Sequence, residues 1–141
     1  MEIEFLIIAD AAEVVNNKLY MMGGGWNQWR SPAYPAPARL GIAVGLLVPW
    51  DETNEKHPVR LSILDADGRP IVPEIGAEVE VGRPAGITVG TKQRALLAIN
   101  AGFPVPGPGR YEVRVVAGRN GEQRNVTFEA LLAGGPTVQI Q

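Results

Sequence analysis

The chain has 141 residues, a net charge of −2 at pH 7 and no cysteine. This length suits a single domain spanning residues 1–141. The near-neutral charge gives no reason to expect a nucleic-acid partner, and the absence of cysteine excludes disulfides and thiolate chemistry. The 17 glycines and 12 prolines punctuate short apolar runs, a pattern that favours many short strands over disorder.

The first segment reads MEIEFLIIAD, with Glu2 and Glu4 inside a short apolar run. The apolar odd positions from Ile3 to Ala9 predict a strand. No basic region precedes this run, so we do not interpret it as a signal peptide. Because no apolar run in the chain approaches the length of a membrane span, we expect a cytoplasmic protein with no membrane partner.

A second strand, with Leu19 and Met21, follows two asparagines at 16–17, which tolerate positive φ and suit a tight turn. It leads into MMGGGWNQW, residues 21–29. A dinucleotide-binding loop would need a third glycine at Gln28 and then a helix, which the proline-rich sequence that follows cannot form. We therefore expect Gly23 to Gly25 to form a strand bend that relieves crowding beside Trp26.

Residues 39–48 form the most apolar predicted strand. Its even positions, from Leu40 to Val48, are large, whereas its odd positions are small and uncharged: Gly41, Ala43 and Gly45. A strand with one solvated face would carry polar residues there. We therefore expect this small-residue face to pack against the proline-rich residues 30–38, which favour polyproline II geometry, or against a second subunit.

Alternating apolar residues predict further strands near residues 59–64, 75–81, 93–101, 111–117 and 126–130. Turn signals separate them, at Asp67-Gly68 and at residues 118–121. Residues 134–141 are expected to form a loose tail or a short edge strand. About eight or nine short strands at this spacing are typical of a sandwich.

Tyr111 follows a Pro-Gly-Pro-Gly-Arg turn, which is the setting of the tyrosine corner in immunoglobulin-like sandwiches. The core tryptophan of antibody domains is absent from residues 59–64. We therefore predict an all-β, immunoglobulin-like antiparallel β-sandwich that is not a true antibody-type domain.

Several stretches together resemble an uncharacterised bacterial family of small β-sandwich domains. They are Ala9–Ala12, the Lys-Leu-Tyr-x-x-Gly-Gly-Gly-Trp motif at residues 18–26, Val48–Asn54 and Leu64–Gly68. The resemblance covers nearly the whole chain, although the family tends to have Gly-Lys where this chain has Asn17-Lys18. It implies one sandwich domain and no particular activity, because the family has no assigned function.

Two acidic loops are candidate cation sites. The run from Asp65 to Gly68 resembles the start of a calcium loop, but Arg69 and Gly76 stand where later ligands are needed, so a turn is favoured. An oxygen-rich loop at residues 51–57 holds Asp51, Glu52, Asn54, Glu55 and His57. We favour a solvated connection there over a metal site, and no cofactor is expected.

Catalytic signals are weak. His57 is the single histidine, the serines are Ser31 and Ser62, and no nucleophile elbow is present. Glu78 and Glu80 share one strand face, which is typical of solvated surface and not of acid–base chemistry. We therefore favour a protein that is not an enzyme and assign no catalytic residue.

The loop aromatics complete the candidate surface, which comprises Trp26, Trp29, Tyr34, Trp50, Asp51 and His57. The favoured interpretation is that the aromatics cover the open ends of the core, and the alternative is an exposed platform. The leading functional hypothesis is a non-catalytic structural or protein-interaction module. We expect it either to form a homo-oligomer, specifically a dimer, or to bind another protein. The alternative is a small-ligand or carbohydrate-binding module, or a weak hydrolase, that uses these aromatics with the 50–57 loop.

Overall fold

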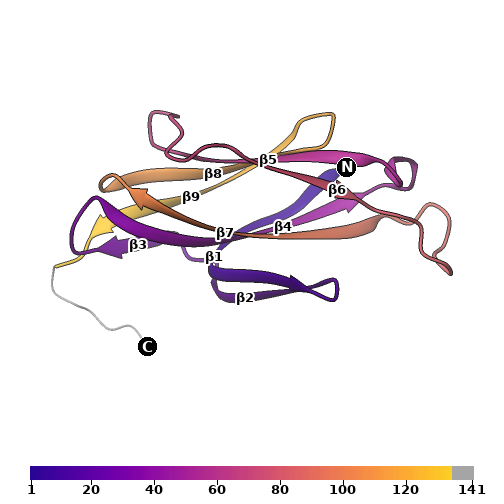
Figure 1. The fold of residues 1–141 in the computed structure, drawn as a ribbon, viewed down its shortest axis with the longest axis horizontal. Coiled ribbons are helices and arrows are strands. Elements are labelled where there is room, and N and C mark those ends of the chain that lie inside the picture. Colours follow the sequence, from indigo (N-terminus) through magenta and orange to yellow (C-terminus); the bar gives the residue numbers. More distant parts are fainter. Residues whose placement is uncertain (135–141) are drawn as a thin grey trace.

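Two β-sheets face each other around one apolar core (Figure 1). The computed structural model describes residues 1–134, in which sheet A has the strand order β2-β1-β4-β7 and sheet B has the order β3-β9-β8-β5-β6. The strands are β1 (Glu2–Val15), β2 (Lys18–Gly24), β3 (Gln28–Ser31), β4 (Ala36–Val48), β5 (Lys56–Leu64), β6 (Ile75–Glu80), β7 (Gln93–Val105), β8 (Gly109–Ala117) and β9 (Glu122–Leu132). The predicted all-β sandwich is confirmed.

The core follows from period-two alternation in both sheets. The even positions of β4 from Leu40 to Val48 are all buried, and the odd positions of β5 from Val59 to Ile63 belong to the same buried core. Successive side chains of a strand point to opposite faces, so these two strands each present one apolar row to the interior. The one helical segment within residues 1–134 is the 3₁₀ turn η1 (Trp50–Glu52), and it lacks the length and apolarity to cross a membrane.

The proline-rich segment differs from the prediction. Part of residues 30–38 belongs to strands, because β3 includes Arg30 and β4 begins at Ala36. β3 pairs with β9 in parallel, so sheet B is mixed and the expectation of a fully antiparallel sandwich is wrong at this edge. A parallel pair needs no tight turn between its strands, and therefore leaves no short-range turn signal in the sequence.

The predicted turns form at the expected residues. Asn16 and Asn17 adopt φ of 50° and 59° between β1 and β2, as a two-residue hairpin turn requires. Asp65 Oδ1 accepts hydrogen bonds from the backbone N–H groups of Asp67 and Arg69, at 3.0 and 2.9 Å. This carboxylate oxygen caps its own turn, in agreement with the turn interpretation of that acidic run.

The glycine run does bend the chain, but its crowded neighbour was predicted incorrectly. Gly23 has φ of +61°, and a Cβ placed on it would lie 2.4 Å from the Asp10 carboxylate. A Cβ on Gly24 would meet only ordinary van der Waals contacts at 3.5 Å and beyond. The constrained position in this run is therefore Gly23, and its crowding neighbour is Asp10 and not Trp26.

The small-residue face of β4 is covered by β1 of the same chain. A Cβ on Gly45 would lie 2.1 Å from the Phe5 ring, and a Cβ on Gly41 would lie 2.6 Å from the Ala11 carbonyl carbon. Neither the proline-rich segment nor a second subunit is needed to explain these glycines. The expectation that named those two neighbours is wrong, because β1 itself crosses this face.

Beyond Ala9, β1 separates from β4, and the hairpin of β1 and β2 projects from the outer side of sheet A (Figure 1). Asn100 on β7 holds it there: its Oδ1 accepts a bond from the Ala12 N–H at 3.1 Å, and its Nδ2 donates to the Ala12 carbonyl at 2.8 Å. The side-chain amide thus replaces the strand neighbour that Ala12 would otherwise have in β4.

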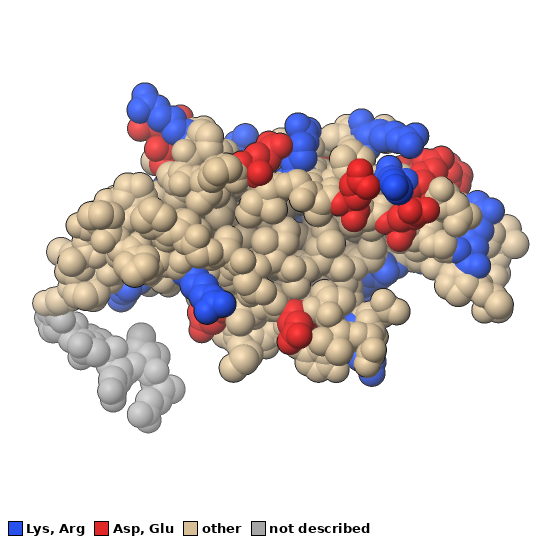
Figure 2. All heavy atoms as spheres, in the orientation of Figure 1, with Lys and Arg blue, Asp and Glu red and all other residues tan. Residues whose placement is uncertain are grey.

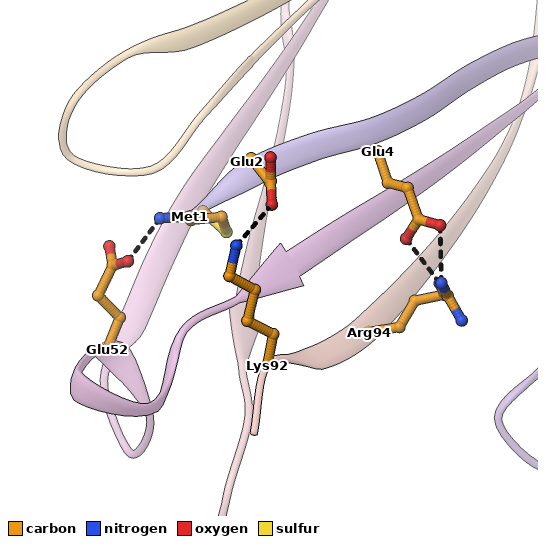
Figure 3. A network of polar contacts seen from close by, with 6 residues as sticks. All are labelled: Met1, Glu2, Glu4, Glu52, Lys92 and Arg94. Carbon is orange, nitrogen blue, oxygen red and sulfur yellow. Dashed lines mark hydrogen bonds and ion pairs between the residues drawn. The ribbon is translucent and has the colours of Figure 1, made fainter. Parts of the chain in front are cut away.

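The other end of β1 is fixed by ion pairs, drawn in Figure 3. Arg94 of β7 makes two hydrogen bonds of 2.7 Å to the Glu4 carboxylate, and Lys92 lies 3.2 Å from Glu2. The amino group of Met1 pairs with Glu52 of η1 at 2.5 Å. The Arg94–Glu4 pair joins β7 to β1 across the intervening strand β4, whereas the Met1–Glu52 pair joins the start of the chain to η1. The predicted tail beyond residue 134 lies outside the described residues.

Candidate functional site

Three of the predicted aromatics lie together beside β3 and β9. Trp26 packs edge-to-face on Phe128 with ring centroids 5.9 Å apart, and Trp29 packs similarly on Tyr34 at 6.2 Å. The Tyr34 hydroxyl donates a hydrogen bond to the Leu131 carbonyl at 2.6 Å. All three are half-buried against the core, so their rings cover this end of the sandwich, as the favoured interpretation expected.

Trp50 lies in η1, directly after β4. The Arg83 guanidinium stacks over its ring at 4.3 Å from the centroid and also donates to Thr53 Oγ1 at 2.7 Å. Asp51 is exposed beside it. Arg83 therefore stabilises the 50–53 turn through a cation–π contact and a side-chain hydrogen bond.

The two aromatic groups do not converge. Tyr34 precedes β4 and Trp50 follows it, and this strand of 13 residues spans about 43 Å at the usual rise per residue. Trp26 and Trp29 lie at the Tyr34 end. The pocket expected from Trp26 together with the 50–57 loop is therefore wrong, because an extended strand separates its parts.

His57 is a structural residue in this arrangement. Its side chain is 1% exposed, and Nε2 lies 2.7 Å from the Glu52 carbonyl oxygen, which can only accept a hydrogen bond. Nε2 therefore carries the proton and holds the start of β5 against η1. Burial keeps the ring away from solvent and substrate. Within residues 1–134, no group of three or more His, Asp and Glu side chains is placed to hold a metal ion together.

The surface that sequence reasoning missed is the hairpin formed by β1 and β2. It carries three large apolar side chains that are exposed to solvent: Tyr20 is 56%, Met21 39% and Met22 74% exposed. β2 lies at the edge of sheet A, and all of its residues except Leu19 are exposed. An apolar edge strand of this kind is a template for pairing with another chain.

A hollow of about 530 Å³ lies between this hairpin and the outer face of sheet A. Its lining combines two apolar side chains of β2 with charged and amide groups of β1, β4 and β7: Tyr20, Met22, Asp10, Glu13, Arg39 and Asn100. We call it the hairpin hollow. The hollow exists because Asn100 holds Ala12 while the rest of the hairpin diverges from the sheet.

Charge is distributed unevenly over the molecule. Figure 2 shows Lys, Arg, Asp and Glu gathered over β5, β6, β8 and β9 along the upper side of the view, with fewer of them on the lower side, where the hairpin lies. Between Lys18 and Arg30 the chain carries no charged residue. The hairpin surface is therefore better suited to an apolar or strand-like partner than to a highly charged one.

One sequence signal could have identified this surface. Residues 19–22 read Leu-Tyr-Met-Met, an unbroken apolar run in a strand only seven residues long. A half-buried strand alternates polar with apolar residues, so an unbroken run indicates either burial on both faces or an exposed apolar surface. Only the position of β2 at the sheet edge shows that this run is an exposed apolar surface.

Comparison with protein families matches residues 4–126 to DUF6941, described as a family of unknown function. A comparison with curated proteins found none that matches the chain. The matched range includes the glycine motif, the hairpin and the core strands as far as the first five residues of β9. This agrees with the prediction of an uncharacterised family, and the chain belongs to the DUF6941 family.

Proposed function

We propose that this domain is a non-catalytic protein-interaction module whose binding surface is the hairpin of β1 and β2. An extended segment of a partner adds to the free edge of β2 and covers Tyr20 and Met22. The observation that carries the proposal is the exposure of these two side chains, 56% and 74%, on an edge strand without charged residues after Lys18. Strand addition of this kind combines main-chain hydrogen bonds with side-chain pockets.

Separate observations support the proposal that the domain is non-catalytic. The single histidine is buried and bonded to a backbone carbonyl, as expected for a packing role. The aromatics beside β3 pack on the core and on one another. The hairpin hollow gives the partner a concave surface next to the strand edge, and Arg39 and Glu13 in its lining offer polar groups for contacts.

An immunoglobulin-like topology belongs to the same proposal. Strands β1-β4-β7 opposite β9-β8-β5-β6 correspond to the A-B-E and G-F-C-C′ orders of such sandwiches. The Tyr111 hydroxyl donates to the Gly107 carbonyl at 2.7 Å, as in a tyrosine corner on strand F. The fold alone assigns no function. The cytoplasmic location stays a prediction from the sequence.

Photocrosslinking tests the proposed surface. A benzophenone amino acid in place of Tyr20, produced in cells that naturally contain the protein, is expected to give adducts with protein. Val89 provides the matched control, because it is 78% exposed but lies in the segment between β6 and β7. Adducts from position 20 and not from position 89 support the hairpin as the binding surface. Equal adducts from both positions, or none from position 20, contradict it.

A further inference from the structure

The geometry points to a second copy of this chain as the partner, with two β2 strands pairing antiparallel about a two-fold axis at Met21. This inference rests on the proposed function of the hairpin and names its partner. The edge of β2 is self-complementary in backbone, side chains and charge. A two-fold interface uses the same surface on both subunits, and such dimers are the commonest closed oligomers.

The backbone groups available for pairing follow from the hairpin register. The two-residue turn makes Val15 and Lys18 a hydrogen-bonded pair, so alternate residues of β2, from Tyr20 onward, direct their backbone groups toward β1. Leu19 and Met21 therefore direct theirs outward. Ala12, which lies opposite Met21, confirms the alternation from the other strand, because its N–H and carbonyl point away from β2 to Asn100.

An axis at Met21 uses this outward set. Met21 pairs with Met21 of the partner subunit and exchanges both backbone hydrogen bonds with it. Leu19 lies opposite Gly23 of the partner subunit, where the bend at Gly23, with φ of +61°, ends the regular pairing. Tyr20 then lies opposite Met22 of the partner subunit on the face that lines the hairpin hollow. A methionine sulfur beside an aromatic ring is a favourable contact, and directly opposite side chains lie close enough to make it.

The distribution of charge also supports the antiparallel orientation of the two β2 strands. Lys18 begins β2, and the Asp10 carboxylate lies beside Gly23 at the other end of the strand. In an antiparallel pair, the lysine end of one strand meets the aspartate end of the other, so opposite charges lie at both ends of the interface. A parallel pair would place lysine beside lysine, and like charges at such a position are unfavourable.

The other sheet edges carry features that oppose such pairing. β6 has two exposed glutamates, Glu78 and Glu80. In β7 every large apolar side chain is buried or half-buried, and Pro104 lies near its end. β3 has only four residues and includes Arg30. Charges, prolines and short length are the usual means by which sheet edges avoid association, and β2 has none of them after Lys18.

The interface is small. Seven paired residues on each side bury less than the roughly 800 Å² per partner of a standard interface. We therefore expect a dimer that dissociates in the micromolar range or above, and whose population depends on protein concentration.

Cysteine crosslinking tests the register directly, because the chain contains no cysteine. Met21→Cys places two thiols at the axis, where opposite Cα atoms lie at about 5.5 Å, within the range of a disulfide. Under mild oxidation this variant is expected to form covalent dimers at least tenfold faster than Val89→Cys. A mixture of Tyr20→Cys and Met22→Cys is expected to crosslink faster than either variant alone, because these positions face each other.

Light scattering from low micromolar to millimolar concentration provides the second measurement. The unmodified chain and Val89→Lys are expected to dimerise alike, whereas Met21→Lys places two ammonium groups at the axis and is expected to stay monomeric. A native-like unfolding transition for Met21→Lys shows that this loss is not a folding defect. A monomer at all concentrations, with no faster crosslinking at Met21 than at Val89, overturns the inference. If photocrosslinking at Tyr20 captures only a different protein, the proposed function stands and self-pairing fails; if it captures none, both fail.

Discussion

Replacing Gly41 with alanine tests how β1 crosses the outer face of sheet A. The added Cβ would lie 2.6 Å from the Ala11 carbonyl carbon and 2.7 Å from the Ala12 nitrogen. Both atoms belong to the backbone of β1, so no side-chain rotation relieves the contact. The hairpin has to move by several tenths of an ångström or more, and this displacement weakens the Asn100 hydrogen bonds as well.

The expected magnitude combines two effects. Overpacking at a tight contact costs about 1–3 kcal/mol, and each hydrogen bond from Asn100 to Ala12 contributes about 1 kcal/mol. We expect Gly41→Ala to lower the free energy of unfolding by roughly 2–4 kcal/mol. Gly76 of β6 is the matched control, because a Cβ there has no heavy atom within 4 Å. Gly76→Ala is expected to be neutral or to stabilise by up to about 1 kcal/mol.

Urea unfolding followed by tryptophan fluorescence measures both variants. A double-mutant cycle with Asn100→Ala adds a second criterion: once Gly41→Ala has displaced Ala12, removing the amide costs less than it does in the unmodified chain. We expect the two effects to fall short of additivity by about 1 kcal/mol or more. Unchanged stability of Gly41→Ala, or additive effects in the cycle, would refute the proposed contact between β1 and β4.

Three further predictions concern separate contacts. Gly23→Ala is expected to lower the free energy of unfolding by about 1–2 kcal/mol because φ is +61° at this position, whereas Gly24→Ala is expected to be tolerated. Equal losses for the two variants in urea unfolding would contradict Gly23 as the constrained position of the bend. Tyr111→Phe removes the bond to the 107 carbonyl and is expected to cost about 0.5–1.5 kcal/mol in the same assay, and no loss would remove the tyrosine corner as a stabilising feature. The hydrogen bonds from Arg94 hold the pKa of Glu4 below its ordinary value. The pair therefore stabilises the fold at pH values above the pKa that Glu4 has in the unfolded chain. This stabilisation is lost as the pH falls through the lower pKa of Glu4 in the folded state. Arg94→Gln should raise the Glu4 pKa in an NMR titration, and an unchanged pKa would show that the pair does not persist in solution.

Several features of this protein were predictable because they depend on residues close together in the chain. Asn16 and Asn17 supply the positive φ of a two-residue turn, and Tyr111 finds its hydrogen-bond partner four residues away. The alternation in β5 and β8 identifies the core face of each strand without knowledge of its neighbours. Local geometry and side-chain period therefore determined the all-β class, the main strands and most turns.

Other features depended on contacts between distant residues. Gly41 and Gly45 indicated that something lies close to β4, but two equally small positions do not reveal whether a ring, a backbone or another subunit covers them. The pairing of Asn100 with Ala12 joins residues 88 positions apart, and neither type of residue has a preference for such a partner. The candidate site depended on tertiary structure for the same reason. The sequence alone determined that Leu19 to Met22 are apolar, whereas the fold decided that they lie on an open edge, because exposure depends on which strands are left without a neighbour.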